Sequence, residues 1–490
     1  MIRATLFLML AGPAAAAEPR FEPVAVPSHV YAGGWEHFVG GGLAVFDCDG
    51  DGLPEMLAAG GENPMTLLRN RGAMRFDPGT FPEIRGAIGA YALDIDGDGP
   101  LDLVVLRVGP NLALRGDGSC GFAPDDFGSL PDGGDAWTTA FSATWEPGRD
   151  RPTLAWGNYV DRADPEGPFG TCDRNLVARP RPNGGWTSIV LEPGFCALSA
   201  LFSDEDRDGR ATLRLSNDRH YYVRGGAEQV WDPARDRFLG PEDGFEAPSI
   251  WGMGIASRDV TGDGRPDLAL TSMGDQLLLL STPTGHEPAS YETGATATRP
   301  HAGGDGRPST GWHAAWGDVD DDGDADLFIA KGNVDQMPDM AMADPNNLLL
   351  NDGGRFREAS VEAGVASAHR GRGAALVDLD GDGRLDLAVV NRRASLEVWR
   401  NATDGGASVA VTLRQPGGNG HAVGAWVELR TPAGVQNQEV TVGGGHAGGV
   451  AGPLHFGIGA AEGAELRVTW PDGATGPWRG VRPGAVTVER

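Results

Sequence analysis

The sequence is poor in features that mark several large protein classes. Lys331 is the only lysine among 40 basic residues, and 68 acidic residues give a formal net charge of −28. Negative charge on this scale repels phosphate groups, so it argues against nucleic acids and anionic membranes as partners. Beyond the N-terminus, no apolar run approaches the roughly 20 residues that a membrane-spanning helix needs. The mature chain is therefore expected to be soluble.

Motifs of common enzyme classes are missing as well. The sequence contains no nucleophile elbow, no P-loop and no H-E-x-x-H pair. It has four cysteines but no C-x-x-C pair that would indicate redox or metal chemistry. These absences favour a binding protein and leave catalysis as the alternative hypothesis.

The sequence is rich in a short acidic loop. Residues 377–390, VDLDGDGRLDLAVV, place Asp378, Asp380 and Asp382 at alternating positions. Asp386 follows after a sharp turn at Gly383, which glycine permits at no steric cost. Several carboxylates aimed at one point suit a hard cation held by oxygen ligands. A solvated acidic turn is the alternative, because Asp and Gly both favour turns.

The loop recurs five more times, which favours the cation site over a chance turn. Three further copies are intact, and two have lost one carboxylate, to Thr261 or to Thr212. The predicted metal ligands of the intact loops are Asp47, Asp49, Asp51 and Glu55; Asp94, Asp96, Asp98 and Asp102; Asp318, Asp320, Asp322 and Asp326; and Asp378, Asp380, Asp382 and Asp386. The eroded loops, predicted to bind more weakly, offer Asp259, Thr261, Asp263 and Asp267, and Asp204, Asp206 and Asp208.

Calcium (Ca2+) is the predicted ion. Oxygen-only ligands in a flexible number suit calcium better than magnesium, and no His or Cys converges on the loops as zinc or copper would require. The loops differ from an EF-hand, whose twelfth-position Glu is replaced here by Ala58, Val105, Ile329 and Val389. Short apolar runs flank the loops, so each ion is expected in a turn between two β-strands.

The spacing of the loops predicts the fold. Their first acids stand at residues 47, 94, 204, 259, 318 and 378, and the gap of 110 residues is about twice the others. A degenerate copy is expected near residues 145–155, where Trp145 and Pro147 replace carboxylates. Repeats of roughly 40 to 60 residues with about four strands each indicate propeller blades. We predict an all-β, seven-bladed β-propeller over residues 18–404, closed by the N-terminal segment RFEPVAV as the outer strand of the last blade.

The N-terminus indicates export. Residues 1–17 combine Arg3, an apolar stretch and small residues, which is typical of a signal peptide cut after Ala17. A membrane anchor is the alternative, although the apolar stretch is short for a bilayer of ~30 Å. A secreted or periplasmic location is therefore predicted. In such a compartment cysteines form disulfides; Cys172 and Cys196 are the expected pair, and pairing of Cys48 with Cys120 is left open.

After residue 404 the acidic loops stop. Segments such as SVAVTLRQPGG and AELRVTWPDG alternate apolar and polar residues between Gly and Pro turns. Alternation of this kind is typical of half-buried strands. Residues 405–490 are therefore predicted to form a separate small β-sandwich.

These motifs resemble known families. The D-x-D-x-D-G-x-x-D loop inside a blade-length repeat is similar to the FG-GAP or VCBS repeat of integrin α-subunit propellers. The stretches NGHAVGAWVELR, GGGHAGG, LHFGIG and VTWPDG resemble the ASPIC/UnbV domain, although His446 stands where that domain usually has an aromatic residue. A propeller followed by this domain is the layout of the cartilage acidic protein 1 family, here in an exported bacterial form. The resemblance implies calcium binding in an exported protein.

Two functions fit this architecture. The first is an interaction module, in which a calcium-stiffened propeller presents the face opposite the ion loops to a protein or glycan; a structural scaffold cannot be separated from it by sequence. The second is a propeller lyase or hydrolase at the mouth of the axis, with His313 as acid and Arg372 as anion clamp. Alternatively, Trp251 and Trp312 only plug the channel. The residues expected at this mouth are Trp251, Met253, Trp312, His313 and Arg372.

Overall fold

The structure is a computed structural model that describes residues 17–490 apart from 165–169, 219–225, 297–305 and 336. Residues 1–16, and with them nearly all of the predicted signal peptide, lie outside the described part. Strands dominate the described residues, and none of their helices is long and apolar enough to cross a membrane. The short helical turns are η1 (Trp35–His37), η2 (Pro241–Asp243), η3 (Tyr291–Thr293) and α2 (Ser360–Ala363).

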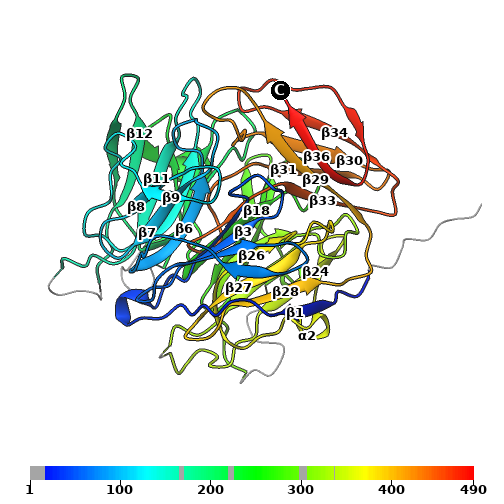
Figure 1. The fold of residues 1–490 in the computed structure, drawn as a ribbon, viewed down its shortest axis with the longest axis horizontal. Helices are drawn as coiled ribbons and strands as arrows, with labels where there is room; N and C mark the ends of the chain where they lie inside the picture. The colour runs from blue at the N-terminus through cyan, green and yellow to red at the C-terminus, as the bar shows by residue number, and fades with distance from the viewer. Residues whose placement is uncertain (1–16, 165–169, 219–225, 297–305, 336) are drawn as a thin grey trace, which may run out of the picture.

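Residues 21–401 build a ring of antiparallel sheets (Figure 1). Short apolar strands joined by tight turns pair with their neighbours in the chain, which gives the described residues seven sheets of four propeller strands each. The first three sheets are β2 (Leu43–Phe46), β3 (Glu55–Ala58), β4 (Thr66–Asn70) and β5 (Phe76–Pro78); β6 (Ala87–Leu93), β7 (Asp102–Arg107), β8 (Leu112–Gly116) and β9 (Phe122–Pro124); and β10 (Thr138–Thr144), β11 (Thr153–Asn158), β12 (Asn175–Pro180) and β13 (Trp186–Leu191).

The remaining four sheets continue this pattern. The first strand of each sheet packs beside the first strands of both neighbours, so these strands line a central axis. The all-β propeller class predicted from the sequence is confirmed. The sheets are β14 (Ala197–Ser203), β15 (Thr212–Asn217), β16 (Gln229–Asp232) and β17 (Arg237–Phe238); β18 (Gly252–Arg258), β19 (Asp267–Ser272), β20 (Leu277–Thr282) and β21 (Gly285–Pro288); β22 (Gly311–Gly317), β23 (Asp326–Lys331), β24 (Asn347–Asp352) and β25 (Arg355–Glu358); and β26 (Arg370–Val377), β27 (Asp386–Arg392) and β28 (Glu397–Asn401) with β1 (Phe21–Val24).

The last sheet is completed by the N-terminal strand. β1 pairs antiparallel with β28, with Phe21 opposite Asn401 and Val24 opposite Val398. Phe21 is buried against the apolar core between the sixth and seventh sheets. The predicted closure of the ring by the segment RFEPVAV is therefore confirmed.

The C-terminal residues form two further sheets, drawn orange to red in Figure 1. Val411, Val427, Phe456 and Leu466 belong to the apolar core between them, as expected for a sandwich. One sheet orders β33 (Leu454–Gly459), β29 (Ala407–Arg414) and β36 (Gly484–Glu489), and the other orders β31 (Val435–Glu439), β30 (Trp426–Arg430), β34 (Ala464–Thr469) and β35 (Arg479–Val481).

A loop of the C-terminal domain enters the propeller axis. Between β31 and β33, residues 442–451 contact the innermost strands of five sheets. Within this axial loop, β32 (Val450–Ala451) pairs parallel with β2, while Gly448 bridges to Ala90. His446 is fully buried, and its backbone N–H donates to Nδ1 of His313 at 3.0 Å. The two domains are thus joined through the centre of the ring.

Substitution of Gly89 should test this contact. A Cβ atom added to Gly89 would overlap the backbone carbonyl of Ala447 in the axial loop. We expect Gly89→Ala to lower the stability by about 1 to 3 kcal/mol, because overpacking forces the backbone to shift. Gly434→Ala is the matched control, since its added Cβ meets no atom within 4 Å. Thermal unfolding of both variants measures the loss of stability. Equal melting temperatures would contradict the tight packing of the axial loop against Gly89.

Candidate metal centres

The first carboxylate of each ion loop fixes the loop conformation. Asp378 Oδ1 accepts a hydrogen bond from the Gly381 N–H, and Oδ2 accepts one from the Gly383 N–H, both at 2.8 Å. Gly381 and Gly383 have φ angles of 76° and 90°, a left-handed conformation that favours glycine. The predicted sharp turn at Gly383 is therefore confirmed. Equivalent pairs of bonds reach Asp47, Asp94 and Asp259.

The last carboxylate ties the loop to the sheet. Asp386 accepts the Leu379 N–H at 2.9 Å with one oxygen and the Asn401 N–H of β28 at 2.8 Å with the other. This double acceptor role was missed by sequence reasoning, which treated Asp386 only as a metal ligand. It is shared by Glu55, Asp102, Asp267 and Asp326.

Part of the predicted ligand set converges in space. In three loops, oxygen atoms of the first, third and ninth residues lie within 4.8 Å of one another. In the first loop, Asp49 Oδ1 is buried and has no hydrogen-bond partner among the described residues, so it is free to face a cation. Oxygen donors at these spacings fit calcium. The three groups are Asp47, Asp49 and Glu55; Asp94, Asp96 and Asp102; and Asp318, Asp320 and Asp326, while the eroded loop brings together Asp204, Asp206 and Asp208.

Burial and mutual repulsion raise the pKa values of carboxyl groups in two of these loops and of Asp386. In the Asp318 loop, burial first and neighbouring carboxylates second raise the pKa of Asp320 to about 7 and lift the pKa values of Asp318 and Asp326 well above their usual range. Burial likewise raises the pKa of Asp102 to about 7 and that of Asp386 to about 8. The ionised loops are therefore costly in the fold unless a cation offsets their charge.

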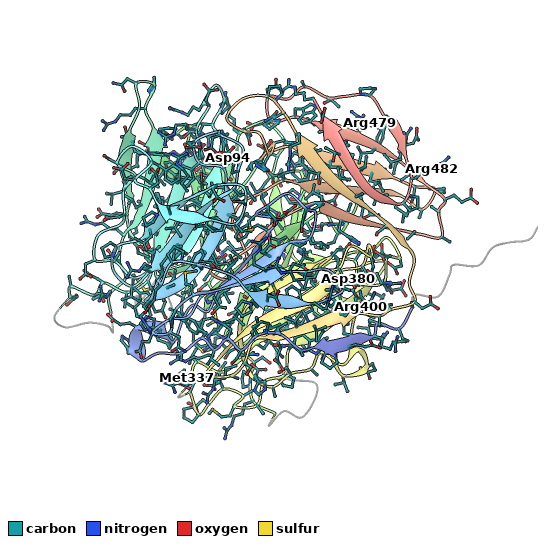
Figure 2. The ribbon with its side chains drawn as sticks, in the orientation of Figure 1. Asp94, Met337, Asp380, Arg400, Arg479 and Arg482 are labelled. Atoms are coloured by element: carbon teal, nitrogen blue, oxygen red, sulfur yellow. A yellow bond between two sulfur atoms is a disulfide. The ribbon has the colours of Figure 1, made fainter. Side chains whose placement is uncertain are left out.

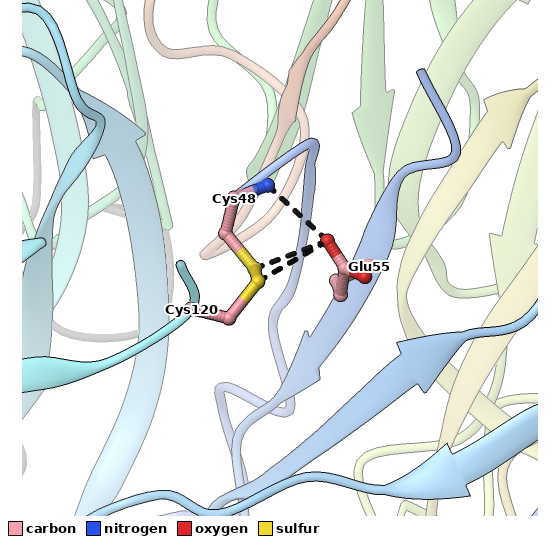
Figure 3. A group of neighbouring side chains, drawn as sticks. All are labelled: Cys48, Glu55 and Cys120. Atoms are coloured by element: carbon pink, nitrogen blue, oxygen red, sulfur yellow. Dashed lines mark hydrogen bonds between the residues drawn. A yellow bond between two sulfur atoms is a disulfide. The ribbon is translucent and has the colours of Figure 1, made fainter. Parts of the chain in front are cut away.

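A disulfide borders the first loop (Figure 3). Cys48, which lies between two predicted ligands, is bonded to Cys120 of the second sheet. Cys48 Sγ lies 3.0 Å from Glu55 Oε2, and the Cys48 N–H donates to the same oxygen at 3.2 Å. The sequence left this pairing open. The expected disulfide between Cys172 and Cys196 is also present.

The C-terminal domain covers the ion-loop end of the ring. Asn437 Nδ2 donates to Asp259 Oδ2 at 2.8 Å, and Glu439 accepts hydrogen bonds from Ser203 Oγ (2.6 Å) and the Asp204 N–H (2.9 Å). Both eroded loops therefore contact polar groups of the other domain. The sequence offered no signal for these partners, because they lie more than 170 residues away in the chain.

The intact loops also contact the C-terminal domain through their backbones. Asp320 O accepts the Gly406 N–H at 2.9 Å, and Asp321 O accepts the Gly459 N–H at 2.8 Å. Gly383 O accepts the Ser408 hydroxyl at 2.6 Å. Ions in these loops would therefore lie close to the contact between the domains.

The residues predicted at the opposite axis mouth are mostly interior. Trp312 and Arg372 have no exposed surface, and Met253 and His313 are 1% and 5% exposed. The Arg372 guanidinium lies 4.1 Å from the Trp312 ring centroid and donates to backbone carbonyls, including Phe38 O at 3.2 Å. The expected ligand face is thus corrected at these four positions, because the axial loop and the ring itself enclose them.

Trp251, the fifth residue of that face, is partly buried and packs against the apolar cluster that contains Met253 and Trp312. The plugging alternative therefore describes Trp312 best. Burial also lowers the pKa of His313 to about 4, so its imidazole is neutral near pH 7.

Comparisons with known proteins support the repeat and domain assignment. Residues 47–105 and 333–389 match the FG-GAP-like repeat family, and residues 415–488 match the ASPIC and UnbV family. The chain therefore carries FG-GAP-like repeats followed by an ASPIC/UnbV domain, as predicted. Neither match names the cartilage acidic protein 1 family, so that narrower assignment stays a prediction. No relative was found among curated proteins.

Several solved structures are similar in outline. The complex of BBS1N with ARL6DN has 10% identity and a TM-score of 0.46, covering 77% of this chain and 96% of that one. YCF48 bound to D1 peptide has 12% identity and a TM-score of 0.43, covering 80% and 99%. An Agrocybe aegerita lectin that recognises non-reducing terminal N-acetylglucosamine has 17% identity and a TM-score of 0.39, covering 71% and 88%. Likenesses this distant do not indicate what this chain binds.

Loss of the ninth carboxylate should destabilise its sheet even without metal. Asp386→Ala leaves two buried N–H groups unpaired, and each lost acceptor costs about 1 to 3 kcal/mol. Asp386→Asn keeps one acceptor oxygen and should lose less. Chemical unfolding of both variants in chelator measures the difference. An alanine variant as stable as the parent under these conditions would contradict the structural role of Asp386.

Removal of divalent cations should make stability depend on pH in a defined direction. The folded pKa values of Asp102 and Asp386, about 7 and 8, exceed the ordinary value of 3.8. Protonated carboxyl groups are therefore favoured in the fold, so their contribution is full below about pH 4 and is lost as the pH rises through 7 and 8. In chelator, the melting temperature should fall between pH 5 and 8, and saturating calcium should largely remove this fall. A rise in chelator over that range would contradict the prediction.

Proposed function

We propose that this chain of FG-GAP-like repeats and an ASPIC/UnbV domain is an exported calcium-binding propeller that acts as an interaction module for a protein or glycan. The observation that carries the proposal is the convergence of carboxylate oxygens within 4.8 Å in several independent loops. Loops of this kind lie at one end of the ring, where an ion would rigidify the hairpin between the first two strands of a sheet.

Calcium is favoured over magnesium by the donor set. The predicted ligands of the intact loops are carboxylates, and their oxygen atoms come from residues spread over a nine-residue turn. Calcium accepts such flexible sets of six to eight oxygens, whereas magnesium demands near-octahedral geometry and retains its waters. The chain's own residues supply the anionic pocket, and bound calcium would offset the repulsion among them.

Export is supported by two features. The N-terminal residues have the composition of a signal peptide. All four cysteines are paired in disulfides, which persist in oxidising compartments such as the periplasm or the cell exterior. A net charge of −28 also favours a non-nucleic-acid partner.

An exposed aromatic residue marks a candidate contact surface. Trp35 of η1 is 47% exposed, and its ring stacks on Phe38 with centroids 4.6 Å apart. η1 precedes β2, so it lies at the end of the ring away from the ion loops. Exposed tryptophans with a supported ring are favoured in binding sites for proteins and sugars. We propose Trp35 as the contact residue in place of the enclosed axis residues.

Calcium should stabilise the fold measurably. Extracellular calcium modules have dissociation constants of ~10⁻⁴ to 10⁻³ M, so each site contributes about 0.4 to 1.4 kcal/mol at millimolar calcium. We expect four intact loops to bind, the melting temperature to fall on chelation, and calcium to restore it better than magnesium. Asp380→Ala should remove one loop's share. Equal melting temperatures with calcium and chelator would contradict the proposal.

A binding screen can identify the partner. The mature chain, with calcium and with chelator, should be tested against a glycan array and against exported proteins of the same cell. Trp35→Ala should weaken the binding of any ligand at that surface, with only a modest fall in melting temperature because the ring is half exposed and packs on Phe38 and Trp137. Binding that survives both chelation and Trp35→Ala would contradict the calcium-stiffened interaction surface.

A further inference from the structure

An arginine on the third strand of the seventh sheet reaches the ion loop of that sheet. Arg400 of β28 donates from Nε to Asp380 Oδ2 at 2.6 Å and from Nη2 to Asp382 Oδ2 at 2.7 Å. Figure 2 shows Arg400 beside Asp380. Both carboxylates are predicted calcium ligands. The positively charged guanidinium therefore lies close to the position that the ion would take.

The same position carries an arginine in two other sheets with intact loops. Arg69 of β4 is paired with Asp49 and, at 3.2 Å, with Glu55. Arg115 of β8 is paired with Asp96 and, at 3.0 Å, with Asp98. Even in the degenerate third sheet, Arg179 of β12 donates to Glu146 at 2.7 Å.

The loop that begins at Asp318 differs from these three. Leu350 of β24 stands at the register of Arg400, because Leu349 lies opposite Leu327 as Trp399 lies opposite Leu387. Within the described part of the chain, no arginine or lysine forms an ion pair with the four predicted ligands of this loop, which are Asp318, Asp320, Asp322 and Asp326. None of these four carboxylates therefore has the direct arginine pair that the other intact loops have, although the buried Arg258 interacts electrostatically with Asp318 and His455 Nε2 lies 3.1 Å from Asp321 Oδ1.

We propose that Arg69, Arg115 and Arg400 are built-in counter-cations that lower the calcium affinity of their loops, so that the Asp318 loop binds calcium most tightly. A guanidinium is always charged and donates to carboxylate oxygens in a fixed geometry. It repels the incoming dication and competes for the same lone pairs. The inference rests on the proposed function, because it assumes that these loops bind calcium.

The counter-cations also change the metal-free loops. Each arginine offsets part of the repulsion among the carboxylates, so its loop depends less on the ion for stability. The Asp318 loop has no arginine paired directly with its four predicted ligands, and it contacts the C-terminal domain through the Gly406 and Gly459 N–H groups. The chain therefore has one resident ion site beside the domain contact and three sites that fill only at higher calcium.

Replacement of Arg400 by leucine tests the proposal, because leucine is the residue at the same register in β20 and β24. Calcium titration of the mature full-length chain by calorimetry should show one tight site and three weaker ones. In Arg400→Leu, one weak site should become about tenfold tighter or more, given the removed charge repulsion. Adding Asp380→Ala should abolish this gain. Arg479→Leu, which removes the same charge from β35, is the control and should change nothing.

The reciprocal variant identifies the tight site. Leu350→Arg should weaken the tightest class by about the same factor, provided that circular dichroism shows an intact fold; a misfolded variant leaves Arg400→Leu to decide. Four equal sites in the parent chain, or an unchanged titration of Arg400→Leu, would overturn the inference and leave calcium binding intact. A parent chain that binds no calcium would overturn the proposed function itself.

Discussion

Buried and half-buried carboxylates that accept backbone N–H groups set the geometry of the ion loops in this protein. Asp378 holds the turn through two glycine N–H groups, and Asp386 joins the loop to the third strand. The loop is therefore organised by hydrogen bonds of its own. The cost of this arrangement is concentrated negative charge in a partly desolvated site. Binding of a cation and folding of the hairpin are consequently served by the same oxygen atoms.

The second organising contact is the axial loop of the C-terminal domain. It places His446 against Trp312, with ring centroids 4.9 Å apart, and it closes the space that many propellers leave along their axis. The domain also contacts both eroded ion loops, through Asn437 and Glu439. Erosion of the metal motif therefore coincides with a new use of those loops as docking points. The two domains are better regarded as one interlocked body than as two modules on a tether.

The local features of this fold can be predicted from the sequence, whereas the contacts between distant segments cannot. The D-x-D-x-D-G spacing predicts the loops and the sharp turn at Gly383. The similarity of RFEPVAV, residues 20–26, to RFREASV, residues 355–361 at the end of the sixth sheet, predicts the closing strand. Arg372 looked like a surface residue because its enclosing partners lie on other strands and on a loop near residue 446. Periodicity reports which residues share a strand, but it carries no information about which distant segment covers them.

The ring can be completed only by strands from opposite ends of the propeller segment, residues 21–401. Phe21 of β1 lies opposite Asn401 of β28, so the first strand to be synthesised must wait for the last sheet before it finds its partner. Contacts of such long sequence separation slow folding, because loop closure is unfavourable until they form. Until closure, β28 is an unpaired edge open to other chains. A truncated copy would keep that edge permanently, so proteases and chaperones could distinguish an unfinished ring from a finished one by the state of a single strand.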